Sequence, residues 1–256
     1  TAGFFLMLFI VAGTFAVVYG ILYVANLIHP VLRFCLEIFF IYQILATKSL
    51  KTESMKVYKK LKEGDLIGAR KEVSYLVGRD TENLDESEVA KADVETIAEN
   101  TADGVIAPML FIAIGGAPLG FAYKAVNTLD SMVAYKNEEL INIGFFSAKM
   151  DDICNFIPAR FAAVMLIIAS LILRFDFKGA VKIFKRDRFA HLSPNSAQTE
   201  AVAAGALQIQ LGGTHNYFGK AVVKPTIGDD IRPVEYEDIK RTNQLLYVSA
   251  VLSMAV

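Results

Sequence analysis

Long apolar stretches, separated by polar segments with helical spacing, form the pattern of this chain. The first stretch, residues 2–28, contains no charged residue. A helix over this range reaches roughly 40 Å at about 1.5 Å per residue, which is enough to cross the hydrocarbon core of a bilayer. We therefore predict a transmembrane helix. A cleaved signal peptide is the alternative, although no basic segment precedes the run and the run is too long for one.

A second apolar helix is predicted over residues 31–46, interrupted only by Arg33 and Glu37. The lysine-rich segment 48–62 follows it, and such a flank is typical of the cytoplasmic side of a membrane. The first helix is then expected to start outside. Because the chain begins with threonine, we expect that further residues precede it.

Residues 48–103 are polar, with apolar positions at helical spacing and glycine-containing breaks, which predicts a cytoplasmic helical hairpin. Residues 84–88 offer an N-cap and an acidic first turn for a further helix. On that helix Glu95 and Glu99 are four positions apart, so that their carboxylates share one face.

Residues 104–123 are uncharged but broken by two prolines and a Gly-Gly pair, which fits either a kinked span or a re-entrant pair of half-helices. Residues 156–173 predict a further membrane span. The basic residues that follow it favour a cytoplasmic location for its C-terminal end. This location is possible only if residues 104–123 cross the membrane fully. We also expect a small-residue helix at 201–211, a loop at 212–230 and the start of a last apolar helix at 245–256.

These elements predict an all-α fold, a polytopic integral membrane helical bundle with about five membrane segments. We expect a single membrane domain over residues 1–256, with residues 48–103 as a cytoplasmic helical insertion. Composition agrees, because 54% of the residues are hydrophobic and the mean hydropathy is +0.41. The net charge of −1 gives no argument for nucleic acid. We expect the chain to be a multi-pass protein of the cell membrane (inner or cytoplasmic), in contact with membrane lipid.

Acidic and amide side chains precede the apolar segment 104–123: Glu95, Glu99, Asn100 and Asp103. Oxygen ligands at this density suit magnesium, which binds through one or two carboxylates together with phosphate oxygens. A solvated acidic helix end is the alternative interpretation.

Polar side chains also follow that segment at helical spacing: Lys124, Asn127, Asp130, Ser131 and Lys136. They fit either a buried ion pair or a phosphate-binding cation next to a metal-binding carboxylate. A third set consists of Asp151, Asp152, Asn155 and Arg160. Helix capping before residue 156 is the alternative explanation for this third set.

Two more polar segments lie in the C-terminal half. The first combines basic, amide and acidic side chains: Lys185, Arg186, Asp187, Arg188, His191, Asn195 and Glu200. The alternative is that these basic residues only set the orientation of the neighbouring membrane helix and bind no ligand. The second is glycine-rich and suggests a ligand-covering loop: His215, Asn216, Tyr217, Lys220 and Lys224. The sequence contains no P-loop, dinucleotide-binding glycine pattern or HExxH motif, so any nucleotide site must be unconventional.

Five ordered segments carry a more specific signal: VETIAENTADGVIAP, GGAPLGFAYKAVNTLDSMVAYK, SAKMDDICNFIPAR, RDRFAHLSPNSAQTEAVAAGALQIQLGG and NYFGKAVVKPTIGD. From about His29 to the C-terminus the chain resembles the cobalamin-biosynthesis CbiB/CobD family, the adenosylcobinamide-phosphate synthases. The opening membrane segment usual in that family, with its Leu-Gly-Asp-Pro and first His-Pro, is absent from this sequence.

The resemblance implies an integral membrane enzyme that joins aminopropanol, as its phosphate, to the free propionate of adenosylcobyric acid by ATP-dependent amide synthesis. ATP is then the co-substrate and Mg²⁺ the cofactor. The expected metal ligands are Glu95, Glu99, Asp103, Asp151 and Asp152. The expected catalytic residues are Glu95, Glu99, Lys136, Asp152 and Arg160. The expected substrate-binding residues are Asn100, Asn127, Asp130, Arg188, Asn195, Asn216, Tyr217 and Lys224.

Two other functions are alternatives, a membrane sensor related to the family and a corrinoid transporter. The intact acid and lysine motifs argue against the sensor, and the lack of a two-fold sequence repeat argues against the transporter. Whether the amine is phosphorylated before coupling stays open at this stage. Two protein assemblies stay open, a homo-oligomer and a complex with other late-pathway membrane enzymes.

Overall fold

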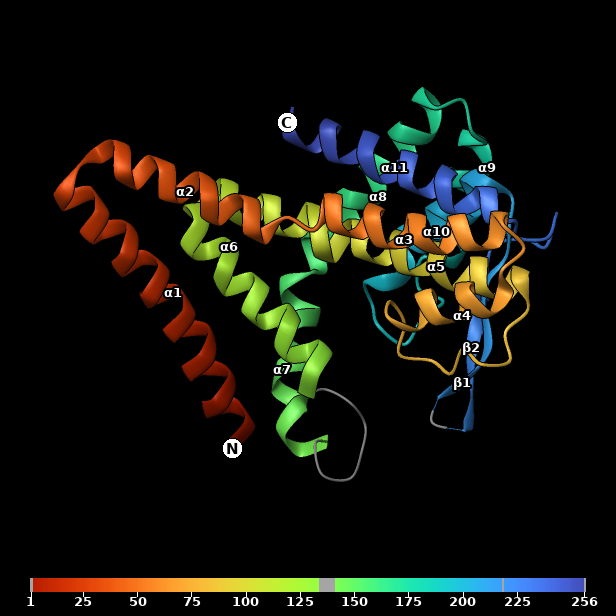
Figure 1. Ribbon diagram of the computed structural model, residues 1–256, viewed down its shortest axis with the longest axis horizontal. Coiled ribbons are helices and arrows are strands. Elements are labelled where there is room, and N and C mark those ends of the chain that lie inside the picture. Colours follow the sequence, from red (N-terminus) through yellow and green to blue (C-terminus); the bar gives the residue numbers. More distant parts are fainter. Residues whose placement is uncertain (1, 134–140, 218, 256) are drawn as a thin grey trace. The chain divides into compact units, whose positions relative to one another are not determined.

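The computed structural model describes residues 2–133, 141–217 and 219–255, which are mostly helical (Figure 1). Lys136, one of the expected catalytic residues, lies outside the described residues. The chain forms two compact units. One contains the residues up to Ala46 together with Asp103–Pro158, and the other contains Thr47–Ala102 together with Ala159–Val256. The predicted helical fold is confirmed, and the expected insertion at 48–103 shares its unit with the C-terminal part of the chain.

The first unit consists of apolar helices: α1 (Ala2–Ile28), α2 (Pro30–Ile44), α6 (Ala107–Val133) and α7 (Ile141–Cys154). α2 begins at a proline, which fits the first position of a helix because its missing N–H needs no partner there. Val18 and Leu22 of α1 pack with Ala117 of α6 in the core of this unit. Burial of these side chains between α1, α2 and α6 holds the three helices together.

α6 bends at Gly115 and Gly116 (Figure 1). Gly116 has a φ of 65°, in the left-handed region that favours glycine. A Cβ atom at this position would lie 2.6 Å from Oε1 of Glu37, so no larger residue fits without movement. A short π-helix, η1 (Thr101–Ile106), precedes α6. The bend interrupts the apolar segment 104–123, as both the kinked span and the re-entrant pair require.

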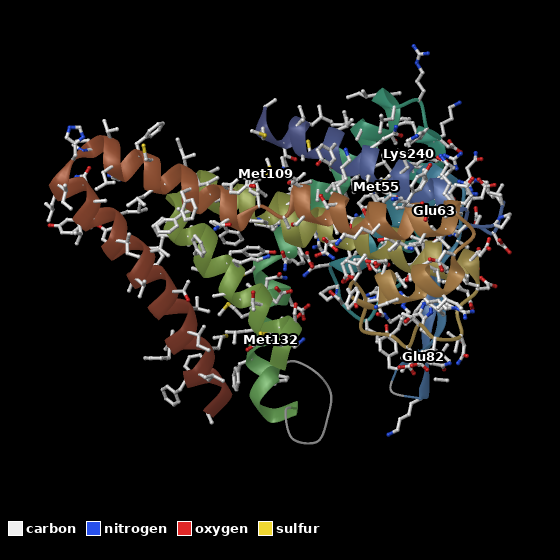
Figure 2. All side chains as sticks on the ribbon, in the orientation of Figure 1. Met55, Glu63, Glu82, Met109, Met132 and Lys240 are labelled. Carbon is white, nitrogen blue, oxygen red and sulfur yellow. The ribbon has the colours of Figure 1, made fainter. Side chains whose placement is uncertain are left out.

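Three helical stretches among the described residues are long and apolar enough to cross a membrane: Ala2–Ile28, Pro30–Lys62 and Glu86–Met132. α7 and α8 (Phe156–Ile172) add a fourth if they form one bent span. Figure 2 shows that carbon dominates the side chains of α1, whereas nitrogen and oxygen tips gather on the second unit. The protein is a helical membrane protein. The expected span at 245–256 is not among these stretches.

The second unit contains α3 (Thr47–Lys62), α4 (Leu66–Ser74), α5 (Glu86–Asn100), most of α8, α9 (Phe177–Asp187), α10 (Ser196–Leu207), β1 (Leu211–Tyr217), β2 (Lys220–Ile227) and α11 (Tyr236–Met254). α5 begins at the predicted N-cap, where Asp85 and Glu88 form a capping box. α10 is buried along its whole length. Its Gly205 lies against α9, because a Cβ there would be 2.4 Å from the carbonyl oxygen of Gly179.

Two predictions for the segment 196–230 of this unit were wrong, one of a helix boundary and one of a loop. The helix expected at 201–211 is α10, which begins at Ser196 and ends because Gln208 takes a left-handed conformation with φ of 59°. The loop expected at 212–230 is largely an antiparallel hairpin of β1 and β2. Gly212 and Gly213 lie at an irregularity in the strand pairing, where both have positive φ. Their flexibility serves a bulge in a strand and not an open loop.

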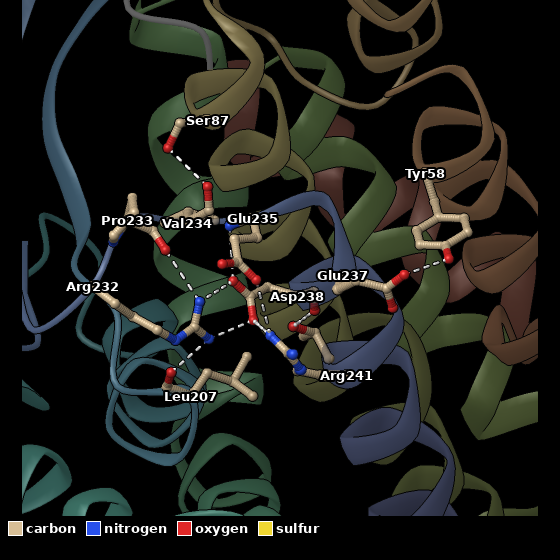
Figure 3. Close-up of polar contacts among 11 residues, drawn as sticks. Tyr58, Ser87, Leu207, Arg232, Pro233, Val234, Glu235, Glu237, Asp238 and Arg241 are labelled. Carbon is tan, nitrogen blue, oxygen red and sulfur yellow. Dashed lines mark hydrogen bonds and ion pairs between the residues drawn. The ribbon is translucent and has the colours of Figure 1, made fainter. Parts of the chain in front are cut away.

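A buried ion-pair network fixes the start of α11 (Figure 3). The fully buried carboxylate of Asp238 accepts hydrogen bonds of 2.6 and 2.8 Å from Arg232 and one of 2.8 Å from Arg241. The same carboxylate accepts the backbone N–H of Glu235 at 2.9 Å, and Arg232 also donates to the carbonyl oxygen of Leu207. α11 therefore begins at these polar residues, upstream of the predicted apolar start.

Candidate functional site

A polar pocket of about 170 Å³ lies in the second unit. It is lined by the turn between α4 and α5, one face of α5, α10 with the loop before it, and the hairpin. The polar lining side chains are Arg79, Glu95, Thr96, Glu99, Asn100, His191, Glu200, Tyr217 and Lys224. The structure thus brings together five residues expected from the sequence: Glu95, Glu99, Asn100, Tyr217 and Lys224.

A buried ion pair between Arg79 and Glu95 forms one wall of the pocket, with side chains only 8% and 9% exposed. Nη2 of Arg79 donates to Oε2 of Glu95, and Oε1 of Glu95 accepts the backbone N–H of Gly212 at 2.7 Å. Nη1 of Arg79 lies 3.1 Å from Nδ1 of His215. Both Glu95 oxygens are therefore engaged, and the pair connects α5 to the hairpin.

Glu99 lies one turn further along α5. Its Oε1 accepts a 2.7 Å hydrogen bond from the hydroxyl of Ser196 at the start of α10. Within the described part of the chain, no hydrogen bond reaches its other oxygen. The neighbouring Asn100 donates from Nδ2 to the carbonyl oxygen of Thr96 at 2.9 Å. Glu99 consequently offers the pocket an oriented carboxylate with one oxygen available to a ligand.

Lys224 supplies a positive charge from the hairpin. Its Nζ lies 5.4 Å from the centroid of the Tyr217 ring, within the range of a cation–π contact. No carboxylate of the described residues forms a salt bridge with this ammonium group. The pocket thus contains an available ammonium group on Lys224 and an available carboxylate oxygen on Glu99, an arrangement suited to a small ligand with charges of both signs.

Burial determines the protonation of the other groups. It raises the pKa of Glu200 well above the usual carboxyl range, and the negative charges of Glu99 and Glu95 raise it further. Burial lowers the pKa of His191. Burial, together with the positive charge of Arg79, lowers the pKa of His215 to about 4. Both histidines are therefore neutral at pH 7.

Three expected residues form a second polar group in the same unit. Nη1 of Arg160 donates to Oδ1 of Asn195 at 3.3 Å. The Arg188 guanidinium lies 4.8 Å from the centroid of the Phe189 ring, and its positive charge repels that of Arg160. Asn216, by contrast, is exposed outside the pocket lining, and its carbonyl oxygen accepts the backbone N–H of Asp80.

The first unit contains a separate, partly buried hydrogen-bond network. Asp151 accepts hydrogen bonds from Asn127 at 3.3 Å and from Asn155 at 3.0 Å. The hydroxyl of Tyr123 lies 2.7 Å from Oδ1 of Asn155 and 2.9 Å from the carbonyl oxygen of Asp103. Two further candidates belong to this unit: Asp130, which is partly buried, and Asp152, which forms a 3.4 Å ion pair with Lys149.

The expected magnesium ligands are divided between the units. Glu95 and Glu99 belong to the second unit, whereas Asp103, Asp151 and Asp152 belong to the first. The described residues contain no group of three or more His, Cys, Asp or Glu side chains that could hold a metal ion. Both Glu95 oxygens are occupied by Arg79 and Gly212, so Glu99 is the expected magnesium ligand of the pocket that has an oxygen available.

Sequence reasoning missed two important pocket residues. Arg79 lies between the predicted helices, next to a glycine that was interpreted only as a break. Glu200 was grouped with a basic segment and assigned no role. A charged residue on a helix whose other side chains are uncharged and mostly small is a signal for Glu200, because such a side chain is rarely buried without a reason. Arg79 offers no comparable local signal.

Comparison with known proteins identifies the class. The model of the CobD/Cbib protein family matches residues 1–246. "Cobalamin biosynthesis protein CobD" of Clostridium perfringens is 55% identical over 100% of this chain and 81% of its own length. The protein of the same name from Streptococcus sanguinis is 53% identical over 98% and 80%. "Cobalamin biosynthesis protein CbiB" of Salmonella choleraesuis is 47% identical over 96% and 77%.

No solved structure matches this chain. The family match and these relatives are sufficient to assign the sequence. This helical membrane protein belongs to the CobD/CbiB family, as the resemblance of its five segments implied.

Proposed function

We propose that this chain acts in cobalamin biosynthesis as a membrane-bound, amide-forming ligase. The reaction joins aminopropanol, as its phosphate, to the propionate carboxylate of adenosylcobyric acid and consumes ATP. The names of the relatives support the pathway. The observation that carries the reaction class is the second-unit pocket, in which family segments far apart in sequence supply charges of both signs.

The size of the pocket favours the amine as its ligand. A volume of about 170 Å³ is below the ~300–1,000 Å³ typical of pockets for drug-sized ligands. A corrinoid is larger than such ligands and would reach the pocket only with its reacting side chain. An amino-alcohol phosphate is small and zwitterionic. In this proposal Glu99 binds its ammonium group and Lys224 binds its phosphate.

Amide synthesis from a carboxylate requires activation, because the carboxylate itself is a poor electrophile. Transfer of the terminal phosphoryl group of ATP to the propionate gives an acyl phosphate, which the amine then attacks. Arg160 and Arg188 are the proposed cations for these phosphoryl groups, since a guanidinium group binds phosphate oxygens in pairs. Asn195 positions Arg160 through the hydrogen bond between them.

The other sequence-derived candidates keep more limited roles in the proposal. Glu95 positions Arg79 and the hairpin and does not react. Asp152 and Asp130 of the first unit stay candidates for catalysis and for substrate binding. Magnesium is proposed to accompany ATP, and no step is assigned to a metal held by the protein.

The purified protein, incubated with adenosylcobyric acid, aminopropanol phosphate and magnesium ATP, tests the proposal. Mass spectrometry should detect the amide together with one ADP per product, and omission of ATP should abolish both. Absence of the amide from the complete mixture contradicts the ligase function. Corrinoid uptake into empty liposomes without ATP or amine would support a transporter instead.

A further inference from the structure

Glu200 on α10 is a buried acid with no hydrogen-bond or ion-pair partner among the described residues. Its side chain is 5% exposed and contributes to the pocket lining. No hydrogen bond or ion pair with another described residue reaches its carboxyl group. Burial of a polar group without such compensation costs free energy, so its retention inside an otherwise small-residue helix requires an explanation. Contact with a ligand that enters the pocket supplies one.

Charged groups surround Glu200 from several elements. Glu95 and Glu99 face it from α5, Arg79 from the turn before α5, and Lys224 from the hairpin. The two negative charges and the burial favour the protonated form, and the two cations oppose it. His191, in the loop before α10, lines the same pocket. The raised pKa means that a carboxylate in such surroundings binds a proton more strongly than an exposed glutamate does, as a base requires.

We propose that Glu200 is the catalytic base of this pocket and takes the proton that the attacking ammonium group of the amine must lose. The inference rests on the amide-forming function proposed above. Glu200 carboxylate accepts one proton from R–NH₃⁺ and leaves neutral R–NH₂. The amine nitrogen then forms the C–N bond to the acyl phosphate, whose C–O bond breaks. The second proton leaves with the departing phosphate, so atoms and charges balance.

The neighbouring groups are less suited to this step. Both oxygens of Glu95 are occupied by Arg79 and Gly212. Nδ1 of His191 accepts the backbone N–H of Ser193 at 3.0 Å, which places the proton of the neutral ring on Nε2 and leaves no acceptor on it. Glu99 carries the hydrogen bond from Ser196 and is assigned to the ammonium charge. Among the pocket carboxylates, Glu200 is the one whose oxygens accept no hydrogen bond from the described residues and have no other assigned role.

Two nucleophiles separate proton transfer from activation of the corrinoid. The full chain, in detergent or membranes, receives adenosylcobyric acid and magnesium ATP with either aminopropanol phosphate or hydroxylamine. Hydroxylamine is neutral at pH 7 and needs no base before it traps the acyl phosphate as a hydroxamate. The amide-forming rate of Glu200→Gln is expected to fall by about 10²-fold or more at pH 7, while its hydroxamate formation stays near wild type.

The pH dependence provides a second readout. Wild-type kcat should decline on the acid side as Glu200 becomes protonated, Glu200→Asp should keep this decline at a reduced rate, and Glu200→Gln should lose it. Equal amide rates in wild type and Glu200→Gln would overturn the inference, as would loss of the hydroxamate together with the amide in that variant. If wild type forms neither product, the proposed function itself fails, which is a distinguishable result.

Discussion

The hydroxyl of Ser196 donates a 2.7 Å hydrogen bond to the carboxylate of Glu99, across 97 positions of the sequence. Ser196 is the first residue of α10 and Glu99 lies near the end of α5. The contact fixes one carboxylate oxygen and leaves the other for a ligand. A hydrogen bond to a charged group contributes about 1.5–3 kcal/mol, enough to hold a single side-chain orientation in the pocket.

Glu99→Gln should reduce amide formation by about 10²-fold, because an amide cannot neutralise the ammonium group of the bound amine. Ser196→Ala should have a smaller effect, roughly tenfold, since the charge remains but its orientation is lost. Steady-state rates on the purified variants measure both. Glu86→Gln, the same change at an exposed position of α5, serves as the control and should keep wild-type activity. Equal activities of Glu99→Gln and this control would contradict the role of Glu99.

Lys224→Met should raise KM for aminopropanol phosphate by about 10-fold or more, because the pocket loses the cation assigned to the phosphate. KM for unphosphorylated aminopropanol should change little, since that ligand makes no such contact. Lys220→Met alters an exposed lysine of the same strand and is the matched control. A parallel rise in KM for both amines would argue against phosphate recognition by Lys224.

Asp152→Ala should abolish corrinoid amidation while the folded protein persists in the membrane, as expected for a functional acid whose ion pair with Lys149 is partly exposed. Asp151→Asn should behave differently. Asp151 accepts hydrogen bonds from Asn127 and Asn155, so this change disrupts a buried network and should lower the amount of folded protein. Gel filtration and turnover distinguish the two effects. Wild-type turnover in Asp152→Ala would remove this residue from the candidates for catalysis.

Asp238→Asn should destabilise the second unit by about 3–5 kcal/mol, since it leaves Arg232 partly buried without its counter-charge. Arg241→Gln should cost less, because that side chain is 38% exposed. Thermal unfolding in detergent compares the two variants. A larger loss in Arg241→Gln than in Asp238→Asn would contradict the central role of the Asp238 carboxylate in this network.

The same carboxylate predicts a pH dependence. Arg232, the N–H of Glu235 and Arg241 together outweigh the effect of burial and lower the pKa of Asp238 below its ordinary value. Its contribution to stability is therefore complete above the unfolded pKa of about 3.9 and is lost as the pH falls through the folded pKa. The difference in stability between wild type and Asp238→Asn should be constant from pH 7 to pH 5 and shrink at lower pH.

Gly205→Ala should destabilise the contact between α9 and α10, because the added Cβ would lie 2.4 Å from the carbonyl oxygen of Gly179. The helices must separate or shift, and overpacking of this kind typically costs about 1–3 kcal/mol. Gly13→Ala on α1 is the control, since no atom lies within 4 Å of its added Cβ. The melting temperature should fall for Gly205→Ala and stay equal or rise for Gly13→Ala. A fall of equal size in both would contradict the close contact.

The sequence by itself determined most of the helices and the family. Residues 2–28 contain no charged side chain and are mostly apolar, so a helix over this range is favourable in lipid. The capping box formed by Asp85 and Glu88 specifies where α5 begins. Both signals are local in the sequence. Spacing along one helix also placed Glu95 and Glu99 on the same face. Clustering in sequence also suggested that Glu99 and Asp103 share a site, and of these two residues the pocket lining contains Glu99 and not Asp103.

Only the tertiary structure decided which polar residues meet. The hairpin at 211–227 was interpreted as a loop, since its pairing depends on hydrogen bonds between strands and not on a local periodicity. Arg79 and Glu200 line the pocket and Ser196 orients its Glu99, through contacts that span about a hundred residues of chain or more. Charge pairing and burial depend on distances in space, so the electrostatics of the pocket could not be predicted from the order of the residues in the sequence.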